Sequence, residues 1–389
     1  MTKSRISRSA FGIRYFKKAP LRSKSKKRVP VGQWNWQPFD PQRANLVNTG
    51  DTNWKDCIQT NYYPGKKQQK VILIFETGVL TSGFIKHFEN MGLTYFCFDY
   101  DEFIERGFVN VALDNKGNKK SWLALGSIKL NLNDVVAVLW GRPKMFHFSR
   151  SPEPELTNKY INFVRWKGLM RDLPCLINPR ALWLPGPPLT GSFEWQNKLS
   201  ELIIAKQIGL NTPETICTNN KKVVSAFCKK WKNKIIFREF SEAGAYYFVK
   251  NKFVSFRKDE KGHVINSPVV LQQYVNKLCE YRVVAVGDKV FPCRIDSQAS
   301  NLTQMDWRYY DNARVRWEQA RLPHEVEKKL VLFMKKINLT WGSFDLIESP
   351  DNKIYFLEFN RPGATYWLLP FVGLDVPYEI AKYLKRILK

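Results

Sequence analysis

Short apolar runs alternate with one amphipathic segment in residues 70–150. Residues 71–75 (VILIF), 95–98 (YFCF) and 135–140 (VVAVLW) are apolar and rich in β-branched and aromatic side chains, which predicts buried strands. Between the first two, residues 83–92 place Phe84, Phe88 and Met91 on one face of a predicted helix. The order strand, helix, strand predicts a small α/β domain built on a parallel sheet.

The pattern changes after a loop rich in Pro and Gly at residues 185–191, which is the clearest boundary signal in the chain. A helix is predicted before it, at 153–172, and another after it, at 194–208, ending at Gly209. Strands predominate next, at residues 235–240, 246–249, 253–256, 269–275, 281–286 and 290–295. The predicted elements after these are a helix at 323–337, two strands at 342–348 and 354–359, and an amphipathic helix at 375–388.

The distribution of charge indicates a basic tail at the N-terminus. The chain has 62 Lys and Arg against 35 Asp and Glu, a net charge of +27, and eleven of the cations lie in residues 1–35, which contain no acid. Residues 1–35 are therefore predicted to be a disordered basic tail, and the polar, turn-rich residues 36–69 a linker. The body keeps a surplus of about +16, which indicates an anionic partner such as nucleic acid, an acidic membrane surface or an acidic substrate.

Several classes of protein are excluded. No apolar run is long enough for a transmembrane helix, and the N-terminus lacks the apolar segment of a secretory signal, so we expect a cytoplasmic protein without a membrane partner. The seven cysteines are odd in number and contain no C-x-x-C spacing, which argues against a disulfide framework or a zinc ribbon. The four histidines show no metal-site spacing.

The most specific chemistry lies in the last two predicted strands. Glu358 and Asn360 are two residues apart, so their side chains project from the same face of a strand. The turn at 349–353 centres the hairpin so that Asp345 lies opposite Glu358. Two carboxylates and a carboxamide converging in an apolar setting predict a Mg²⁺ site, with Mn²⁺ as an alternative metal. The competing interpretation is a polar strand that faces solvent.

At this point the sequence resembles the ATP-grasp ligases. The resemblance rests on Asp345-x12-Glu358-x-Asn360, on the helix entry Asn197-Lys198-Leu199 that ends before Pro213, on residues 271–275 (LQQYV) and on residues 280–283 (EYRV). Residues 294–300 (RIDSQAS) and 306–308 (DWR) are most similar to the microviridin-type graspetide synthetases, which form side-chain ester or amide links in a ribosomal precursor peptide.

The resemblance implies a fold, domains and cofactors. The fold class is α/β (α+β): an ATP-grasp fold with an N-terminal pre-ATP-grasp parallel-sheet domain, at 70–180, followed by the ATP-grasp domain at 181–389. The implied cofactors are ATP and Mg²⁺, and the implied partner is a precursor peptide, expected to be acidic. A homodimer is left open, and a nucleic-acid partner is not expected.

The resemblance also implies roles for individual residues. The residues implied for ATP are Lys198, Arg238, Gln272, Gln273, Tyr274, Val275 and Glu280. Arg294 and Arg282 are implied as catalytic residues, and Asp306 and Arg308 as contacts of the substrate. Two departures bear on these roles. Arg238 stands where ATP-grasp enzymes normally carry a phosphate-binding Lys, and Arg361-Pro362 follows Asn360 where the family often has Pro-Asn.

Alternatives stay open at this stage. Glu280 could simply pair with Arg282, and Arg282, Asp306 and Arg308 could form a structural set of ion pairs. The acceptor could differ, as in a glutathione-synthase-like or ribosomal-protein glutamate ligase. A non-catalytic, basic nucleic-acid-binding protein would explain the charge but not the register of Asp345, Glu358 and Asn360.

Overall fold

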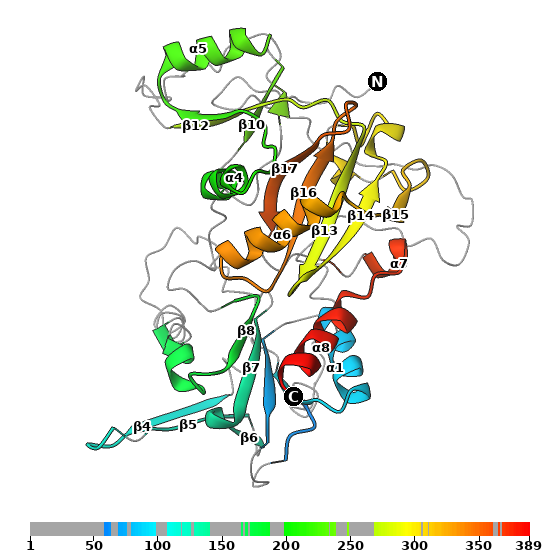
Figure 1. The fold of residues 1–389 in the computed structure, drawn as a ribbon. Helices are drawn as coiled ribbons and strands as arrows, with labels where there is room; N and C mark the ends of the chain where they lie inside the picture. Colours follow the sequence, from blue (N-terminus) through cyan, green and yellow to red (C-terminus); the bar gives the residue numbers. More distant parts are fainter. Residues whose placement is uncertain are drawn as a thin grey trace, which may run out of the picture.

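A computed structural model describes residues 58–63, 69–75, 79–98, 107–117, 119–125, 128–140, 165, 168–169, 172–186, 198–232, 234–238, 247–248, 268–304, 306–309, 311–360, 365 and 368–389. Four sheets organise them, two in the N-terminal part and two in the C-terminal part (Figure 1). Within these residues, no helix is long and apolar enough to cross a membrane.

The N-terminal part is built on a five-stranded sheet of order β1-β3-β2-β7-β8. Strands β3, β2, β7 and β8 run parallel, as the sequence predicts, and β1 pairs antiparallel to β3 at the edge. The bounds are Ile58–Thr60 (β1), Val71–Phe75 (β2), Thr94–Phe98 (β3), Val135–Trp140 (β7) and Leu182–Leu184 (β8). Residues 58–60, at the end of the predicted linker, form the edge strand β1.

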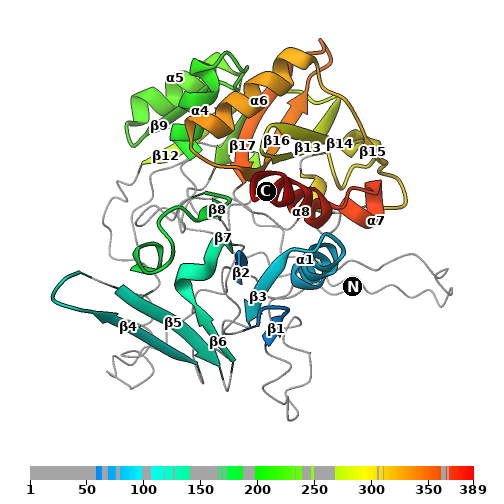
Figure 2. The ribbon, with the colours of Figure 1, turned by 60° about the horizontal axis from the view of Figure 1, so that its bottom comes forward.

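A second, smaller sheet was not predicted. It is antiparallel, of order β4-β5-β6, and consists of Phe108–Leu113 (β4), Lys119–Leu125 (β5) and Ile128–Asn131 (β6). The β4–β5 hairpin projects away from the rest of the molecule in both views (Figures 1 and 2). Its base joins the main sheet through a core that contains Leu123, Leu130 and Val138.

The C-terminal part contains two antiparallel sheets. The first has the order β11-β10-β12-β9, with bounds Thr215–Thr218 (β9), Ile235–Arg238 (β10), Tyr247–Phe248 (β11) and Val269–Gln273 (β12). The second has the order β15-β14-β13-β16-β17, with bounds Cys279–Val286 (β13), Lys289–Ile295 (β14), Trp317–Gln319 (β15), Trp341–Glu348 (β16) and Ile354–Asn360 (β17). The predicted strand at 253–256 lies outside the described residues.

Six α-helices are described with bounds: Val79–Asn90 (α1), Lys198–Gln207 (α4), Lys221–Lys230 (α5), His324–Lys336 (α6), Leu368–Val372 (α7) and Val376–Ile387 (α8). The predicted helix at 153–172 lies mostly outside the described residues. Helix α4 ends where predicted, with Gly209 at φ +81°, a conformation that glycine adopts without strain.

One apolar core joins the two halves of the chain. Phe84 of α1, Leu139 of β7, Trp341 of β16 and Leu384 of α8 all belong to it. The rings of Phe84 and Trp341 meet edge to face at 6.2 Å. The C-terminal helix α8 therefore packs beside α1 of the N-terminal part, as both views show (Figures 1 and 2). The domain boundary near residue 181 stays a prediction.

Gly342 allows β16 and β17 to approach closely. A Cβ atom there would overlap the ring of Phe359 and come within 3.0 Å of the Asn360 carbonyl oxygen. We expect Gly342→Ala to lower the free energy of unfolding by about 1–3 kcal/mol, because β17 must shift. Urea denaturation measures this. Gly168→Ala is the control, since nothing lies within 4 Å of a Cβ there. Equal stability of the two variants would contradict the packing.

Candidate active site

The carboxylate hairpin has the predicted register. Strands β16 and β17 pair Asp345 with Glu358 and Ser343 with Asn360, which places Glu358 and Asn360 on the face that carries Asp345. The Asn360 side-chain nitrogen donates to Asp345 Oδ2 at 2.9 Å. The pairing shifts by one residue after Asp345, a bulge that the sequence did not reveal.

Each carboxylate is paired with an arginine, one from the same sheet and one from the other C-terminal sheet. Arg282 Nη1 of β13 lies 2.8 Å from Asp345 Oδ1, and Arg238 Nη2 of β10 lies 2.5 Å from Glu358 Oε2. Arg238 also donates through Nη1 to the Leu357 carbonyl at 2.9 Å. Arg238 is 2% exposed and Glu358 12%. Charges buried this deeply require such partners, because desolvation of an unpaired charge is very costly.

The two carboxyl groups differ in their affinity for a proton. Burial raises the pKa of Asp345, and the nearby Glu358 carboxylate adds to the rise against the opposing charge of Arg282. Burial also disfavours the Glu358 carboxylate, but Arg238 and Lys198 outweigh it and hold the pKa of Glu358 below its ordinary value. Like charges this close favour uptake of a proton or a cation between them.

The donor set suits a hard divalent cation. Among the described residues, no three His, Cys, Asp or Glu side chains lie so that they could hold a metal ion together. The third oxygen ligand would therefore be the carboxamide of Asn360, whose nitrogen already donates to Asp345 and so leaves the oxygen as the ligating atom. Two carboxylate groups and a carboxamide fit Mg²⁺ or Mn²⁺.

A cavity between the two C-terminal sheets is lined both by residues of this hairpin and by predicted nucleotide-binding residues. Its lining includes the apolar side chains of Ile236 and Ile347 and the carboxylates of Asp345 and Glu358. The other lining residues that the sequence predicted are Gln272, Gln273, Tyr274, Val275, Glu280, Asp306 and Arg308. The sequence missed Pro213, Ile236, Lys277, Ile347 and Leu357, whose apolar or basic character alone marks no site.

The strand predicted to contact adenine is partly engaged in its own sheet. The Tyr274 N–H donates to the Lys234 carbonyl at 3.0 Å. The Gln272 side chain donates to Thr215 Oγ1 at 3.0 Å, and the Gln273 side chain accepts from the Glu214 N–H at 3.2 Å. These two side chains therefore hold β12 in place beside the cavity. Contacts to a base would come from backbone groups at 274–275.

Glu280 pairs with Lys277 and not with Arg282, the partner that the sequence left open as an alternative. It accepts from Lys277 Nζ at 2.7 Å, whereas Arg282 contacts Asp345. Burial raises the pKa of Glu280, although the charge of Lys277 opposes the shift. The Lys-x-x-Glu spacing was the only available signal for this pair.

Lys198 and Glu201 come from the first turn of α4. Burial and the charge of Arg238 lower the pKa of Lys198, while Glu358 and Glu201 act in the opposite direction. Lys198 thus lies within electrostatic reach of the carboxylate hairpin. Glu201 was not predicted; its Oε2 accepts the backbone N–H of Phe359 at 3.2 Å and so fixes α4 to β17.

Asp306 and Arg308 form a two-point ion pair at the rim of the cavity. Arg308 Nε lies 2.8 Å from Asp306 Oδ1, and its Nη2 lies 2.7 Å from Asp306 Oδ2. Trp307 between them is buried against Trp317, with ring centroids 5.5 Å apart. The structure therefore brings both predicted substrate residues to the cavity, and Trp307 packs on Trp317 and lines the same cavity.

Arg294 is not brought to this group. Arg294 pairs across the sheet with Tyr281 of β13, and Tyr281 precedes Arg282 along that strand. Because successive side chains of a strand point to opposite faces, Arg294 lies on the face opposite to that of Arg282. There it pairs with Glu318 at 3.0 Å. The loop at 241–245, interpreted as a phosphate-covering flap, lies outside the described residues.

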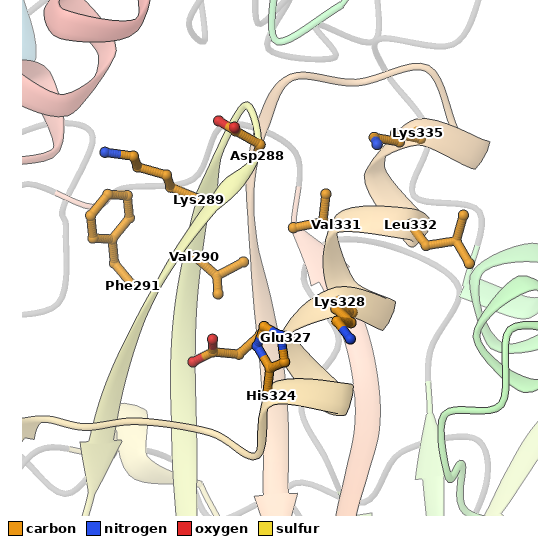
Figure 3. A pocket seen from close by; sticks show the side chains of 10 residues that line it. All are labelled: Asp288, Lys289, Val290, Phe291, His324, Glu327, Lys328, Val331, Leu332 and Lys335. Atoms are coloured by element: carbon orange, nitrogen blue, oxygen red, sulfur yellow. The ribbon is translucent and has the colours of Figure 1, made fainter.

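A larger hollow lies on that other face. It has a volume of about 510 Å³ and is formed by Val290 of β14 with Val331, Leu332 and Lys335 of α6 (Figure 3). Its charged lining residues are Lys289, Lys328 and Lys335 together with Asp288 and Glu327, and none of its lining residues also lines the cavity of Asp345 and Glu358. It is therefore separate from the candidate active site.

Comparison with known proteins bears on the fold. No family model and no curated protein matches the chain. Among solved structures, the macrocyclase MdnC of Microcystis aeruginosa, bound with its precursor peptide MdnA, has a TM-score of 0.65 and 24% identity, covering 82% of this chain and 99% of its own.

Two further structures agree. A RiPP-associated ATP-grasp ligase of Chryseobacterium gregarium, in complex with ADP and a leader and core peptide, has a TM-score of 0.66 and 22% identity, over 82% of this chain and 96% of its own. The ATP-grasp ligase PsnB, complexed with a precursor variant, Mg and ADP, has a TM-score of 0.64 and 16% identity, over 82% of this chain and 99% of its own. The predicted fold class is confirmed: this chain has the fold of the ATP-grasp ligases.

Proposed function

We propose that this protein is an ADP-forming ligase that uses ATP and Mg²⁺ to activate a carboxylate as an acyl phosphate, and that it forms side-chain ester or amide links in a ribosomal precursor peptide. The observation that carries the proposal is that Asp345 and Glu358 line one cavity together with the β12 strand, and that Asn360 contacts Asp345 from the same hairpin. A cytoplasmic location is part of the proposal.

The comparisons support the substrate class. MdnC is a macrocyclase bound with a precursor peptide, and PsnB is complexed with precursor, Mg and ADP. Both cover more than four fifths of this chain with nearly their whole length, so the likeness includes both the N-terminal and the C-terminal parts. The basic body of the chain suits a polyphosphate and an acidic peptide.

The roles follow from charge and position. Arg238 and Lys198 would hold phosphate oxygens, since both are cations beside the carboxylate hairpin. Bound Mg²⁺ would supply neutralisation of the β- and γ-phosphate charge. Asp306 and Arg308 at the rim would contact the peptide, with Arg308 suited to the carboxylate that is activated. Arg282 holds Asp345 in place, so we assign it a positioning role.

The ligase with another acceptor is the main competitor, because its nucleotide and metal residues would be the same. A nucleic-acid-binding protein is a weaker one, since it leaves the paired arginines and carboxylates without a purpose. Binding of RNA or DNA that survives Glu358→Gln, with a steep salt dependence, would favour it.

The test is a reaction with ATP, Mg²⁺ and a candidate precursor, meaning any short Thr-, Glu- and Asp-rich peptide that a neighbouring gene encodes. We expect ADP release that depends on the peptide, and a peptide that loses about 18 Da per link, one water per condensation. Replacing the Thr, Ser or Lys acceptors of the peptide with Ala should stop the mass loss. ADP release with glutamate or a dipeptide, and none with the precursor, would favour the alternative acceptor instead.

A further inference from the structure

Ser343 lies on β16, an interior strand of its sheet with β13 on one side and β17 on the other (Figure 1). Its side chain is fully buried, and among the residues that the structure describes its Oγ atom has no hydrogen-bond partner. A buried hydroxyl group without a partner costs free energy, because it has given up its hydrogen bonds to water. Its surroundings therefore have to explain why it is there.

The described part of the chain contains five buried serines, and Ser343 differs from the other four. Each of those four has a hydrogen-bond partner for its hydroxyl group: Ser121 (Leu176 carbonyl, 2.7 Å), Ser297 (Gln298, 3.1 Å), Ser300 (Asp311, 2.6 Å) and Ser349 (Asp351, 2.5 Å). The fold thus pairs its buried serines as a rule, and the unpaired hydroxyl group of Ser343 is the exception.

Ser343 shares the face of β16 that carries Asp345. Side chains alternate along a strand, so Trp341, Ser343 and Asp345 project to the same side. Trp341 belongs to the apolar core that joins the two halves of the chain, whereas Asp345 is a carboxylate of the candidate metal site. The hydroxyl group of Ser343 therefore lies where this face of the sheet changes from apolar to charged.

The strand partners of Ser343 narrow its role further. On β13 it lies opposite Val284, whose side chain has no polar atom. On β17 it lies opposite Asn360, the carboxamide of the candidate metal site. The register of the hairpin shifts only after Asp345, so the shift does not disturb this pair. The polar neighbours of the hydroxyl group on its own face are therefore members of the candidate metal site.

We propose that Ser343 is a positioning residue of the metal site, whose hydroxyl group accepts a hydrogen bond from a water molecule bound to the divalent cation. This inference rests on the metal assignment in the proposed function. Mg²⁺ keeps several water ligands when few carboxylates bind it. Groups that hydrogen-bond to the ligands of a metal strengthen its binding. Binding of the cation would then also satisfy the one buried serine that the described protein groups leave unpaired.

A structural water molecule is the competing explanation. Arg282 lies opposite Asp345 on the same face, and its Nε atom is also buried without a partner among the described residues. Water held between this atom and the hydroxyl group of Ser343 would satisfy both without a cation. In that case Ser343 stabilises the metal-free protein. As a positioning residue it contributes to stability only when the cation is bound.

Ser343→Ala in the full-length protein separates the two explanations. In EDTA, we expect the urea midpoint of the variant to equal or exceed that of the wild type, because an unpaired hydroxyl group is removed. Mn²⁺ titrated alone, and followed by electron paramagnetic resonance, should bind at least about ten-fold more weakly to the variant. A loss of metal affinity without a loss of stability is a result that a merely structural role does not produce.

Ser121→Ala is the matched control. It removes a similarly buried hydroxyl group from β5, in the N-terminal part, but this group donates to the Leu176 carbonyl. The control should therefore lower the urea midpoint and leave the affinity for Mn²⁺ unchanged.

A Ser343→Ala variant with wild-type affinity for Mn²⁺, or with a urea midpoint below that of the wild type in EDTA, would overturn the inference and leave the proposed function standing. Glu358→Gln should lose Mn²⁺ binding. A wild-type protein that binds no Mn²⁺, or a Glu358→Gln variant that binds it like the wild type, would overturn the metal assignment and this inference with it.

Discussion

Replacing Glu358 with glutamine will reduce peptide-dependent ADP release by at least about 100-fold, because the site loses the charge that would balance a divalent cation and that now balances Arg238. The glutamine keeps the shape of the side chain and can still accept a hydrogen bond from Arg238, so the fold should persist, although with a lower free energy of unfolding because Arg238 loses its counter-charge. Steady-state ADP release with saturating ATP and Mg²⁺ measures the effect, and circular dichroism checks the fold.

Asp351→Asn is the control for this experiment. Asp351 lies in the turn of the same hairpin, exposed and paired with Lys353, so the variant should keep wild-type activity. If Glu358→Gln also turned over at the wild-type rate, the assignment of the hairpin as the metal site would be wrong.

Replacing Arg282 with methionine will lower the free energy of unfolding by about 3–5 kcal/mol, because it leaves the buried Asp345 carboxylate without its counter-charge. Urea denaturation followed by circular dichroism measures the loss. Asp345→Asn in the same chain should recover part of the stability, since the two changes act on one ion pair.

Arg314→Met provides the comparison for this second prediction. Arg314 pairs with Asp311 at 3.3 Å, and its side chain is 69% exposed. An exposed pair of this kind contributes at most about 1 kcal/mol. An Arg282→Met variant as stable as Arg314→Met would show that the Arg282–Asp345 pair is not what stabilises the centre of the sheet.

The register of the carboxylate hairpin could be predicted because two local features determine it. Side chains alternate along a strand, and the turn at 349–353 sets which residues face each other, so Asp345, Glu358 and Asn360 follow directly. The same reasoning did not predict which arginines pair with the two carboxylates. Arg238 and Glu358 are 120 residues apart, and only the folded chain brings β10 beside β17.

The face of a residue is harder to predict than its strand. Arg294 and Arg282 both lie on predicted strands, but their register across the β13–β14 turn places Cys293, and not Arg294, opposite Arg282. Similarity to a family motif gives the position of a residue in the sequence, but it does not give the residue that lies opposite it in the sheet. The pattern of apolar residues also did not predict that α8 packs on α1. The two helices are about 290 residues apart, and a local sequence pattern does not show which distant segment a helix contacts.

The most direct test of the proposed chemistry follows the oxygen atoms of the activated carboxylate. The precursor is prepared with ¹⁸O in its side-chain carboxylates and incubated with the enzyme, ATP and Mg²⁺. Activation as an acyl phosphate predicts ADP and inorganic phosphate that is about 2 Da heavier, one labelled oxygen for each link formed. Unlabelled phosphate, or release of AMP and pyrophosphate, would contradict the account.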